Sequence, residues 1–422
     1  MFKKIILENG LRIILAPKED SFSTTVLVLV GAGSDYEIKE INGVSHFLEH
    51  LCFKGTKKRP TSLDISSELD HLGAVYNAFT SNEITGYFAK ALPQHFEKIL
   101  EIVSDLYLNP IFDPKEIEKE RGVIIEEINM YEDLPMQKAQ ELFAKLLYKD
   151  QSAGQFVAGT KENIKNLKRD DILNYRNQHY LAKAVVVVAA GKIGDENKII
   201  ELVKKNFENT KQGKKEIKTP TQDIQEKPEI LVKEKKLDQT HLVLGVRAYN
   251  LFDKRRFVLE LLSDILGGGM SSRLFQKLRE QLGACYYVNS SANNFIDHGY
   301  LAISSGVDNN RVEEIIKVIL EELDRIKNEE IKEAELQTAK NHLIGNLFLG
   351  LESSNELAGF YGSQEILKEE ILTPEEIAKN IQAVSEKNIQ EVAQDVFQNN
   401  KLNLALIGPA KGQEKIEKIL TF

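Results

Sequence analysis

Two histidines and a glutamate stand close together in the segment His46-Phe47-Leu48-Glu49-His50. In a helix, with its 100° turn per residue, His46 and His50 lie one turn apart and Glu49 lies on the neighbouring row. Two neutral imidazoles at this spacing can bind one zinc ion. The carboxylate can then reach a water on that ion and take its proton as a general base.

The pattern is informative because it is rare by chance. With 8 His and 64 acidic residues in 422, an H-x-x-acid-H string is expected about 0.02 times in a chain of this composition. The glutamate directly precedes the second histidine, which inverts the more familiar H-E-x-x-H order of zinc sites. The alternative is a core helix with two hydrogen-bonded histidines, and the motif alone favours the metal site.

A third ligand is predicted on a separate helix, which begins after the capping residue Asp113. On the helical wheel, Glu120 and Glu127 fall inside the apolar stripe, whereas Glu126 falls outside it. Two carboxylates on a core-facing stripe need a positive partner, and a zinc ion would supply that charge. We therefore predict Glu127 as the third ligand and Glu120 as a carboxylate that orients a ligand from behind. The alternatives are a helix with a different rotational phase and a buried salt bridge.

Composition excludes several classes of protein. A hydrophobic content of 42% and a charged content of 28% indicate a globular chain, and a net charge of −9 argues against nucleic-acid binding. The two cysteines, Cys52 and Cys285, are far apart, which argues against a disulfide framework and favours a reducing compartment. No stretch approaches the length of a signal peptide or of a membrane span. We therefore expect a cytoplasmic protein without a membrane span.

Apolar periodicity predicts an α+β fold. Strands are expected in a hairpin over 2–16 and at 24–30, 73–81, 85–92 and 184–191, and helices at 62–72, 94–107, 195–207 and 310–327.

The second half of the chain repeats the first. Leu72–Asn77 is similar to Leu282–Tyr287, and Gly86–Ala89 is similar to Gly299–Ala302. In the second copy, the segment Leu261–Ile265 stands where the first copy has the histidine motif, so one metal site per chain is expected.

The repeat predicts two domains of similar size, as the length of 422 residues also favours. The charged segment 211–228 contains two prolines and no aromatic residue, which is typical of a linker. We expect a metal-bearing catalytic domain at 1–210 and a related domain without metal at 229–422, which completes the substrate cavity.

Four segments of the chain match the pattern of a known family. They are Gly43–Thr56, Asn77–Ser81, Glu120–Ile128 and Ser272–Tyr286. Together they resemble the pitrilysin-type inverted-zincin peptidases, and within them the short-chain branch typified by the mitochondrial processing peptidase β-subunit and its bacterial relatives. The resemblance implies two related α/β-sandwich halves that face each other across a cavity, with zinc in the N-terminal half alone.

The resemblance also implies roles for individual residues. It implies His46, His50 and Glu127 as the zinc ligands, in agreement with the motif and the helical wheel. It also implies Glu49 as the base that activates water. Asn77 and Ala78 resemble the edge-strand positions that pair with substrate backbone. Arg279 and Tyr286 resemble the pair that holds the substrate carbonyl and the oxyanion. Taken without the family, these last two favour a helix-surface Arg and a core Tyr.

The sequence thus predicts a zinc-dependent endopeptidase with one zinc ion per chain, acting on peptides or unfolded protein segments. The resemblance implies a homodimer or a related-subunit partner. An alternative of another class is a non-catalytic structural or assembly subunit of the same fold, which predicts decay of the motif. A metal-binding scaffold without turnover is a third hypothesis.

Overall fold

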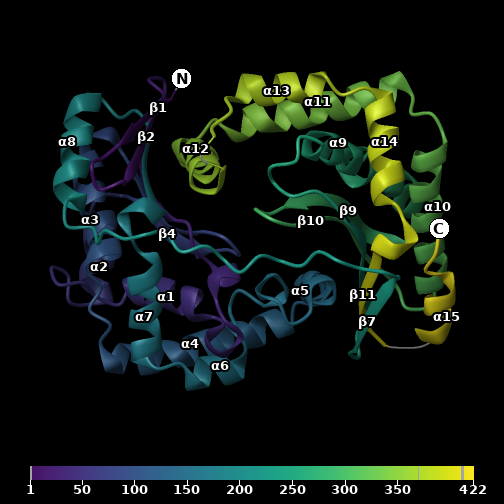
Figure 1. The fold of residues 1–422 in the computed structure, drawn as a ribbon, viewed down its shortest axis with the longest axis horizontal. Coiled ribbons are helices and arrows are strands. Elements are labelled where there is room, and N and C mark those ends of the chain that lie inside the picture. Colours follow the sequence, from purple (N-terminus) through teal and green to yellow (C-terminus); the bar gives the residue numbers. More distant parts are fainter. Residues whose placement is uncertain (1, 369, 410–412) are drawn as a thin grey trace. The chain divides into compact units, whose positions relative to one another are not determined.

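The computed structural model describes residues 2–368, 370–409 and 413–422 (Figure 1). Helices and two sheets form two compact units, which confirms the α+β class. Unit 1 contains Met1–Ile128, Gln155–Thr219 and Phe348–Thr373. Unit 2 contains Asn129–Gly154, Pro220–Leu347 and Pro374–Phe422.

Unit 1 is built on a six-stranded sheet with the order β1-β2-β6-β3-β5-β4. The β2–β6 pair is parallel and the other neighbours are antiparallel. The predicted N-terminal hairpin is confirmed, since Ile6 pairs with Arg12 and Gly10 takes a φ of 87° in the turn. The strands are β1 (Lys3–Ile6), β2 (Arg12–Pro17), β3 (Thr24–Val30), β4 (Val75–Thr80), β5 (Thr85–Ala91) and β6 (Val185–Gly191).

The central strands of this sheet are buried on both faces. Val26, Val28 and Val187 point into a core shared with the helices that follow them in sequence, while Leu27 and Val188 point to the opposite face. The helices of unit 1 are α1 (Val44–Cys52), α2 (Ser62–His71), α3 (Phe96–Leu108), α4 (Pro114–Glu132, to Ile128), α6 (Lys161–Asn166), α7 (Arg169–His179), α8 (Glu196–Phe207) and α12 (Ser354–Lys368).

Helix α12 covers the second face of the unit 1 sheet, although it comes from the second half of the chain (Figure 1). Its residues Ala358, Tyr361 and Ile366 join the cluster that contains Leu27 and Val188. At its first turn, the Ser354 hydroxyl bonds to the hydroxyl of Thr25 at 2.8 Å.

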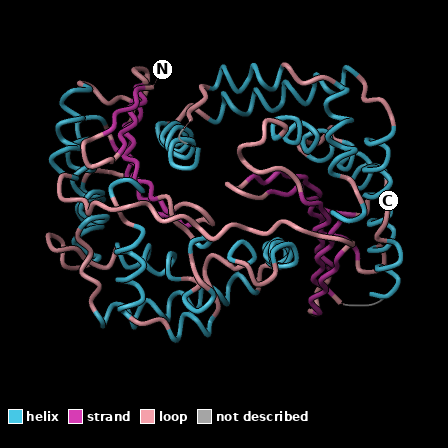
Figure 2. Tube along the Cα trace, in the orientation of Figure 1, coloured by secondary structure: helices cyan, strands magenta, loops and turns pink. Residues whose placement is uncertain are grey.

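Unit 2 repeats this plan with a five-stranded sheet of order β7-β11-β8-β10-β9. The β7–β11 pair is parallel and the rest are antiparallel, so the order and directions match β2-β6-β3-β5-β4 of unit 1. Figure 2 shows the strands of both sheets in magenta. The strands are β7 (Glu229–Glu234), β8 (Gln239–Arg247), β9 (Cys285–Asn294), β10 (Gly299–Asp308) and β11 (Leu402–Gly408).

One face of the unit 2 sheet is covered by α5 (Pro135–Tyr148), a helix from the first half of the chain. Its Phe143 packs in a cluster with Val243 and Ala405. The other helices of this unit are α9 (Arg256–Gly267), α10 (Val312–Asn328), α11 (Glu333–Gly350, to Leu347), α13 (Pro374–Gln382), α14 (Glu386–Val396) and α15 (Gln413–Ile419), with a π-helical segment at Phe275–Gln281.

The compact units differ from the predicted contiguous domains in two segments, 129–154 and 348–373. The physical reason is that each sheet buries both faces, and the helix that covers the second face comes from the opposite half of the chain. The chain passes between the units five times, and one of these passages, Thr219–Pro220, lies inside the predicted linker.

The first part of that predicted linker is anchored to unit 1. The buried Lys218 ammonium lies 3.0 Å from the carboxylates of both Asp35 and Glu83. A lysine buried in this way needs such partners, and they fix the backbone that carries it. The segment up to Lys218 is therefore part of the packed unit.

Two further sequence expectations can be compared with the structure. Cys52 and Cys285 are both free thiols. Within the described part of the chain, no helix has the length and apolar character needed to cross a membrane.

Replacing Gly362 by Ala should destabilise the protein relative to replacing Gly359 by Ala. Both glycines lie inside α12, so both substitutions gain about 1 kcal/mol of helix propensity. A Cβ on Gly362 would lie 2.6 Å from Leu29 Cδ1 and 2.9 Å from Val188 Cγ2, whereas one on Gly359 meets no described atom within 4 Å. Overpacking of this kind costs about 1–3 kcal/mol. Guanidinium unfolding measures the difference, and equal stabilities would contradict the packing of α12 on the unit 1 sheet.

Candidate metal centre

Helix α1 carries the histidine motif and is anchored by its apolar face. Phe47, Leu48 and Leu51 are buried in the core of unit 1. Because these residues fix the rotation of the helix, His46, Glu49 and His50 project from a different face. The motif is therefore held on a short helix whose opposite side is part of the core.

The three predicted zinc ligands converge on one point. The Nε2 atoms of His46 and His50 lie 3.2 Å apart, and one carboxylate oxygen of Glu127 lies 3.6 Å and 3.5 Å from them. In the described part of the chain, this is the one group of three or more His, Cys, Asp or Glu side chains that could hold a metal ion.

The distances fit a tetrahedral ion. Ligands bound at 2.0–2.1 Å with tetrahedral angles lie about 3.3 Å from one another, close to the separations between these donor atoms. The tautomer of His50 fits as well. Its Nδ1 lies 2.9 Å from the Glu120 carboxylate, so Nδ1 carries the hydrogen and Nε2 keeps the lone pair that faces the other two donors.

Glu120 is held behind His50 by a second partner. Its other oxygen lies 2.7 Å from the Lys54 ammonium. Burial raises the pKa of Glu120, but the hydrogen bonds from His50 and Lys54 outweigh it and hold the pKa below its usual range. Glu120 is therefore an ionised acceptor that fixes the orientation of the His50 ring.

The two histidines have opposite electrostatic environments. Burial lowers the pKa of His46 to about 3, so this imidazole is neutral at physiological pH. Burial also lowers the pKa of His50, but the hydrogen bond to Glu120 and the charges of Glu49 and Glu127 outweigh it and raise the pKa overall. The carboxylates around His50 thus make this side of the centre attractive to a cation.

Glu49 lies close to His50 and Glu127, and one of its carboxylate oxygens accepts a hydrogen bond. The Thr80 hydroxyl on β4 donates to that oxygen at 2.6 Å. Burial raises the pKa of Glu49, against the hydrogen bond from Thr80 and the charge of His50, both of which lower it. A carboxylate with a raised pKa is suited to accept a proton and to return it.

Helix α4 presents its carboxylates as the wheel predicts. Glu120 is buried, Glu127 is half-buried and Glu126 is exposed. The Asp113 carboxylate accepts a hydrogen bond from the Lys115 backbone N–H at 2.7 Å, as expected of a residue that caps this helix.

Sequence reasoning missed Thr80 and Lys54. Both lie in the segments that carry the resemblance, and Lys54 follows His50 by four residues. The signal for them is that the carboxylates of Glu49 and Glu120 each need a partner that holds them in place. Both carboxylates are predicted site residues, so a search for their partners within the same segments could find Thr80 and Lys54.

The predicted substrate residues lie on the edge strand of unit 1. Asn77 and Ala78 belong to β4, the last strand in the sheet order. The Ala78 N–H donates to the side-chain oxygen of Asn77 at 2.9 Å. The Ala78 N–H thus has the side chain of the preceding residue as its acceptor.

Arg279 and Tyr286 lie together in unit 2. The Arg279 guanidinium lies 5.5 Å from the centre of the Tyr286 ring and 4.9 Å from that of Phe275. The alternative that Tyr286 is a core residue is wrong, because the residue is 75% exposed. Both polar ends are thus accessible from solvent.

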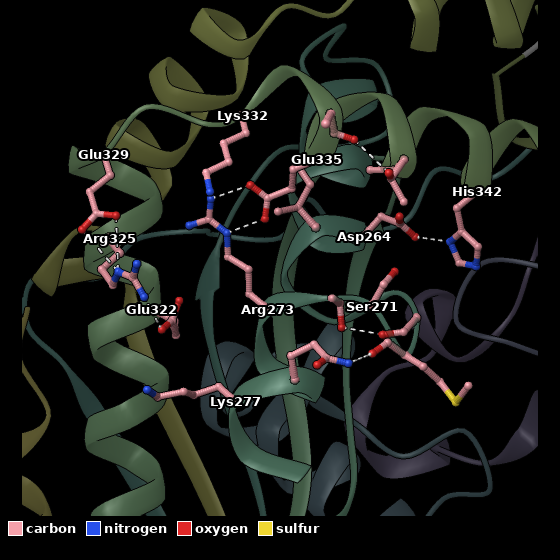
Figure 3. Close-up of a pocket in the computed structure, with 18 of the residues that line it drawn as sticks. Asp264, Ser271, Arg273, Lys277, Glu322, Arg325, Glu329, Lys332, Glu335 and His342 are labelled. Atoms are coloured by element: carbon pink, nitrogen blue, oxygen red, sulfur yellow. Dashed lines mark hydrogen bonds and ion pairs between the residues drawn. The ribbon is translucent and has the colours of Figure 1, made fainter. Parts of the chain in front are cut away.

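Unit 2 has a pocket of about 910 Å³, lined by residues of α9, α10, α11 and the loop at 269–272 (Figure 3). His342 lies 2.7 Å from Asp264, and Arg273 makes a bidentate ion pair with Glu335. Gly269 of this loop also lines the pocket. Most of its charged groups are thus paired within the pocket.

Comparison with known proteins identifies the family. Residues 12–161 match the model of Insulinase (Peptidase family M16), and residues 166–343 match that of the Peptidase M16 inactive domain. The chain is 36% identical to the uncharacterized zinc protease YmxG of Bacillus subtilis, over 97% of this chain and 99% of that protein. The chain belongs to peptidase family M16.

Other relatives agree with this assignment. The chain is 32% identical to the uncharacterized zinc protease SCO5738 of Streptomyces coelicolor, over 98% of this chain and 90% of that protein. The crystal structure of a protease from Helicobacter pylori matches with a TM-score of 0.91 and 25% identity, over 97% of this chain and 99% of that one. The residues matched by the Insulinase (Peptidase family M16) model, 12–161, include His46, His50 and Glu127.

Replacing Glu127 by Gln should weaken Zn²⁺ binding, whereas the same change at Glu126 should leave it unchanged. The two residues are neighbours on α4, but Glu127 contributes an oxygen to the converging donors and Glu126 is exposed. Competition with a chromophoric chelator measures the affinity, and we expect a loss of about 10-fold or more for Glu127→Gln. Equal affinities in the two variants would contradict Glu127 as a ligand.

Proposed function

We propose that this member of family M16 is a zinc-dependent endopeptidase that hydrolyses peptides or unfolded protein segments. The observation that carries the proposal is the convergence of two imidazole nitrogens and one carboxylate oxygen beside the Thr80-bound carboxylate of Glu49. The names of the relatives support zinc as the metal. His46, His50 and Glu127 would hold it.

When bound, zinc would polarise the scissile carbonyl and lower the pKa of a water molecule. The carboxylate of Glu49 takes the proton of the attacking water and later gives it to the leaving amine. Thr80 holds one oxygen of Glu49 and leaves the other for this transfer. Glu120 keeps the His50 ring in the orientation in which Nε2 faces the metal position.

The substrate would bind as an added strand. An extended peptide pairs its backbone with β4, and its carbonyl replaces the Asn77 side chain at the Ala78 N–H. Backbone pairing of this kind requires an unfolded segment, since a folded protein offers few free strands. This supports peptides and unfolded segments as the substrate class.

We also propose that Arg279 and Tyr286 donate hydrogen bonds to the oxygen that becomes negatively charged in the transition state. A guanidinium and a phenol are suitable donors, and both are exposed here.

The alternative of a non-catalytic assembly subunit predicts loss of the metal-binding residues. All three donors, the Glu49 base and the Glu120 support are present, which favours the enzyme over that alternative.

Replacing Glu49 by Gln should abolish hydrolysis without loss of the metal. The amide keeps the shape of the side chain but cannot accept the proton, and removal of general-base catalysis costs about 10²–10⁴-fold in rate. A quenched fluorescent peptide measures turnover, and metal analysis should give about one zinc per chain in both proteins. Glu126→Gln is the control, with unchanged turnover. Equal turnover in Glu49→Gln and the native chain would exclude Glu49 as the base.

Replacing Tyr286 by Phe should lower kcat by about 10²-fold, the effect of removing one oxyanion donor. Tyr287 provides the matched control, because its hydroxyl lies 3.0 Å from His241 Nδ1 in a half-buried contact outside the proposed chemistry. Tyr287→Phe should keep native kcat. If both variants hydrolyse the peptide at the native rate, Tyr286 has no part in the reaction.

A further inference from the structure

A buried carboxylate stands at the beginning of the helix that carries the metal-binding histidines. Glu37 precedes α1 and is 4% exposed. One of its oxygens accepts hydrogen bonds from the backbone N–H of Gly43 at 2.7 Å and from the side-chain amide of Asn42 at 2.9 Å. The other accepts from the backbone N–H of Ser45 at 2.7 Å.

Glu37 replaces the local cap that α1 lacks. The capping position is Gly43, which has no side chain and takes a φ of 98°. The first N–H groups of a helix have no partner within the helix and need one from outside. Here Glu37, six and eight residues upstream, satisfies two of them with two separate oxygens.

This arrangement is demanding for a carboxylate. Burial raises the pKa of Glu37 to about 7, although hydrogen bonds from Ser45, Gly43 and Asn42 lower it. A buried carboxylate without a cation is costly unless its hydrogen bonds are well formed. The hydrogen bonds that Gly43, Asn42 and Ser45 donate to its two oxygens offset this cost and fix the side chain in place.

The loop that carries Glu37 is also bonded to the hairpin of the edge strand. The backbone N–H groups of Ser34 and Asp35 donate to the carbonyls of Ser81 and Asn82 at 3.1 Å and 2.8 Å. These acceptors directly follow Thr80, the residue that binds Glu49. One loop thus contacts both α1, which carries Glu49, and the end of β4, which carries Thr80.

A second contact fixes the same turn of α1 from another side. The Ser45 hydroxyl donates to the Tyr175 hydroxyl at 2.7 Å, which in turn donates to the Gly33 carbonyl at 3.2 Å. Ser45 is therefore held through both its backbone and its side chain. His46 is the next residue along the helix, so a displacement at Ser45 moves the first histidine directly.

We propose that Glu37 is a positioning residue of the metal centre. Its two oxygens set the position of the first turn of α1, so that His46 and His50 face Glu127 while Glu49 reaches Thr80. The catalytic consequence rests on the proposed function, whereas the consequence for metal binding does not. Glu37 itself touches neither the metal position nor the substrate.

The test is Glu37→Gln, which keeps the size of the side chain but replaces one acceptor oxygen by an amide that donates. That amide would face a backbone N–H of Gly43 or Ser45 and force the first turn of α1 to shift. We expect Zn²⁺ affinity, measured by chelator competition, to fall about 10-fold. We expect kcat to fall about 10-fold or more, with KM within about twofold.

Hydrogen exchange of the metal-free protein supplies a readout that does not depend on activity. In Glu37→Gln, the amides of α1 should exchange faster, while those of β3 and β6 should keep native protection. Glu40→Gln is the control, because Glu40 is an exposed residue of the same loop. It should match the native protein in all three measurements.

Native Zn²⁺ affinity and native kcat in Glu37→Gln would overturn the proposal. So would losses of both that equal the unfolded fraction of the variant, since these would reflect stability alone. If Glu37→Gln loses Zn²⁺ affinity while Glu49→Gln keeps full turnover, the positioning role stands and the proposed role of Glu49 fails. The two proposals can thus be separated.

Discussion

The site depends on the convergence of two imidazoles and a carboxylate, which helices α1 and α4 bring to one point. Two imidazole nitrogens and a carboxylate oxygen face each other at separations of 3.2–3.6 Å. A divalent cation at the centre of these three groups would bind all of them at once. Much of the surrounding structure serves to hold this geometry. Glu120 and Lys54 lie behind the His50 ring, Thr80 donates a hydrogen bond to Glu49, and Glu37 accepts one from the first turn of α1.

The internal repeat provides a comparison within one chain. Helix α9 occupies in unit 2 the place between strands that α1 occupies in unit 1. Where the motif has histidines, α9 has Leu261 and Ile265, both buried in the core of its unit. Burial of such side chains contributes about 1.5–3 kcal/mol each. The fold is therefore compatible with aliphatic residues at these positions, and the imidazoles of α1 are not required by the architecture. Their presence in unit 1 is explained by chemistry.

Much of the fold could be predicted from the sequence, because periodicity reports local burial. The hairpin at 2–16, the continuous apolar strands and the capped helix α4 have the predicted boundaries to within a few residues. The phase of α4 singled out Glu127 over Glu126, because a carboxylate inside an apolar stripe is costly without a partner. Thr80, Lys54 and Glu37 escaped notice because their roles arise from contacts between separate elements. A wheel or an alternation pattern carries no information about such contacts.

The positions of α5 and α12 could not be predicted for a related reason. Periodicity shows that β3 and β6 are buried on both faces, but not which helix covers the second face. The charged segment 211–228 predicts the end of the first domain, but the helix that covers the second face of the unit 1 sheet, α12, comes later in the chain. For Tyr286, residue type alone favours the core, whereas the family resemblance implies a donor to the oxyanion. An aromatic residue in a strand of alternating burial is usually internal, yet this one is exposed beside Arg279.

The place of α12 in the chain has a consequence for biosynthesis. A ribosome that has released residues 1–210 has supplied all six strands of the first sheet, but the helix that covers its second face ends at Lys368. Until that helix emerges, an apolar surface of Ile14, Leu27, Leu29, Val186 and Val188 stays uncovered on the nascent chain. At 5–20 residues per second, the delay is on the order of ten seconds or more. During this time the sheet has all of its strands but lacks the cover of one face, so unit 1 is completed only after residue 368 has been made.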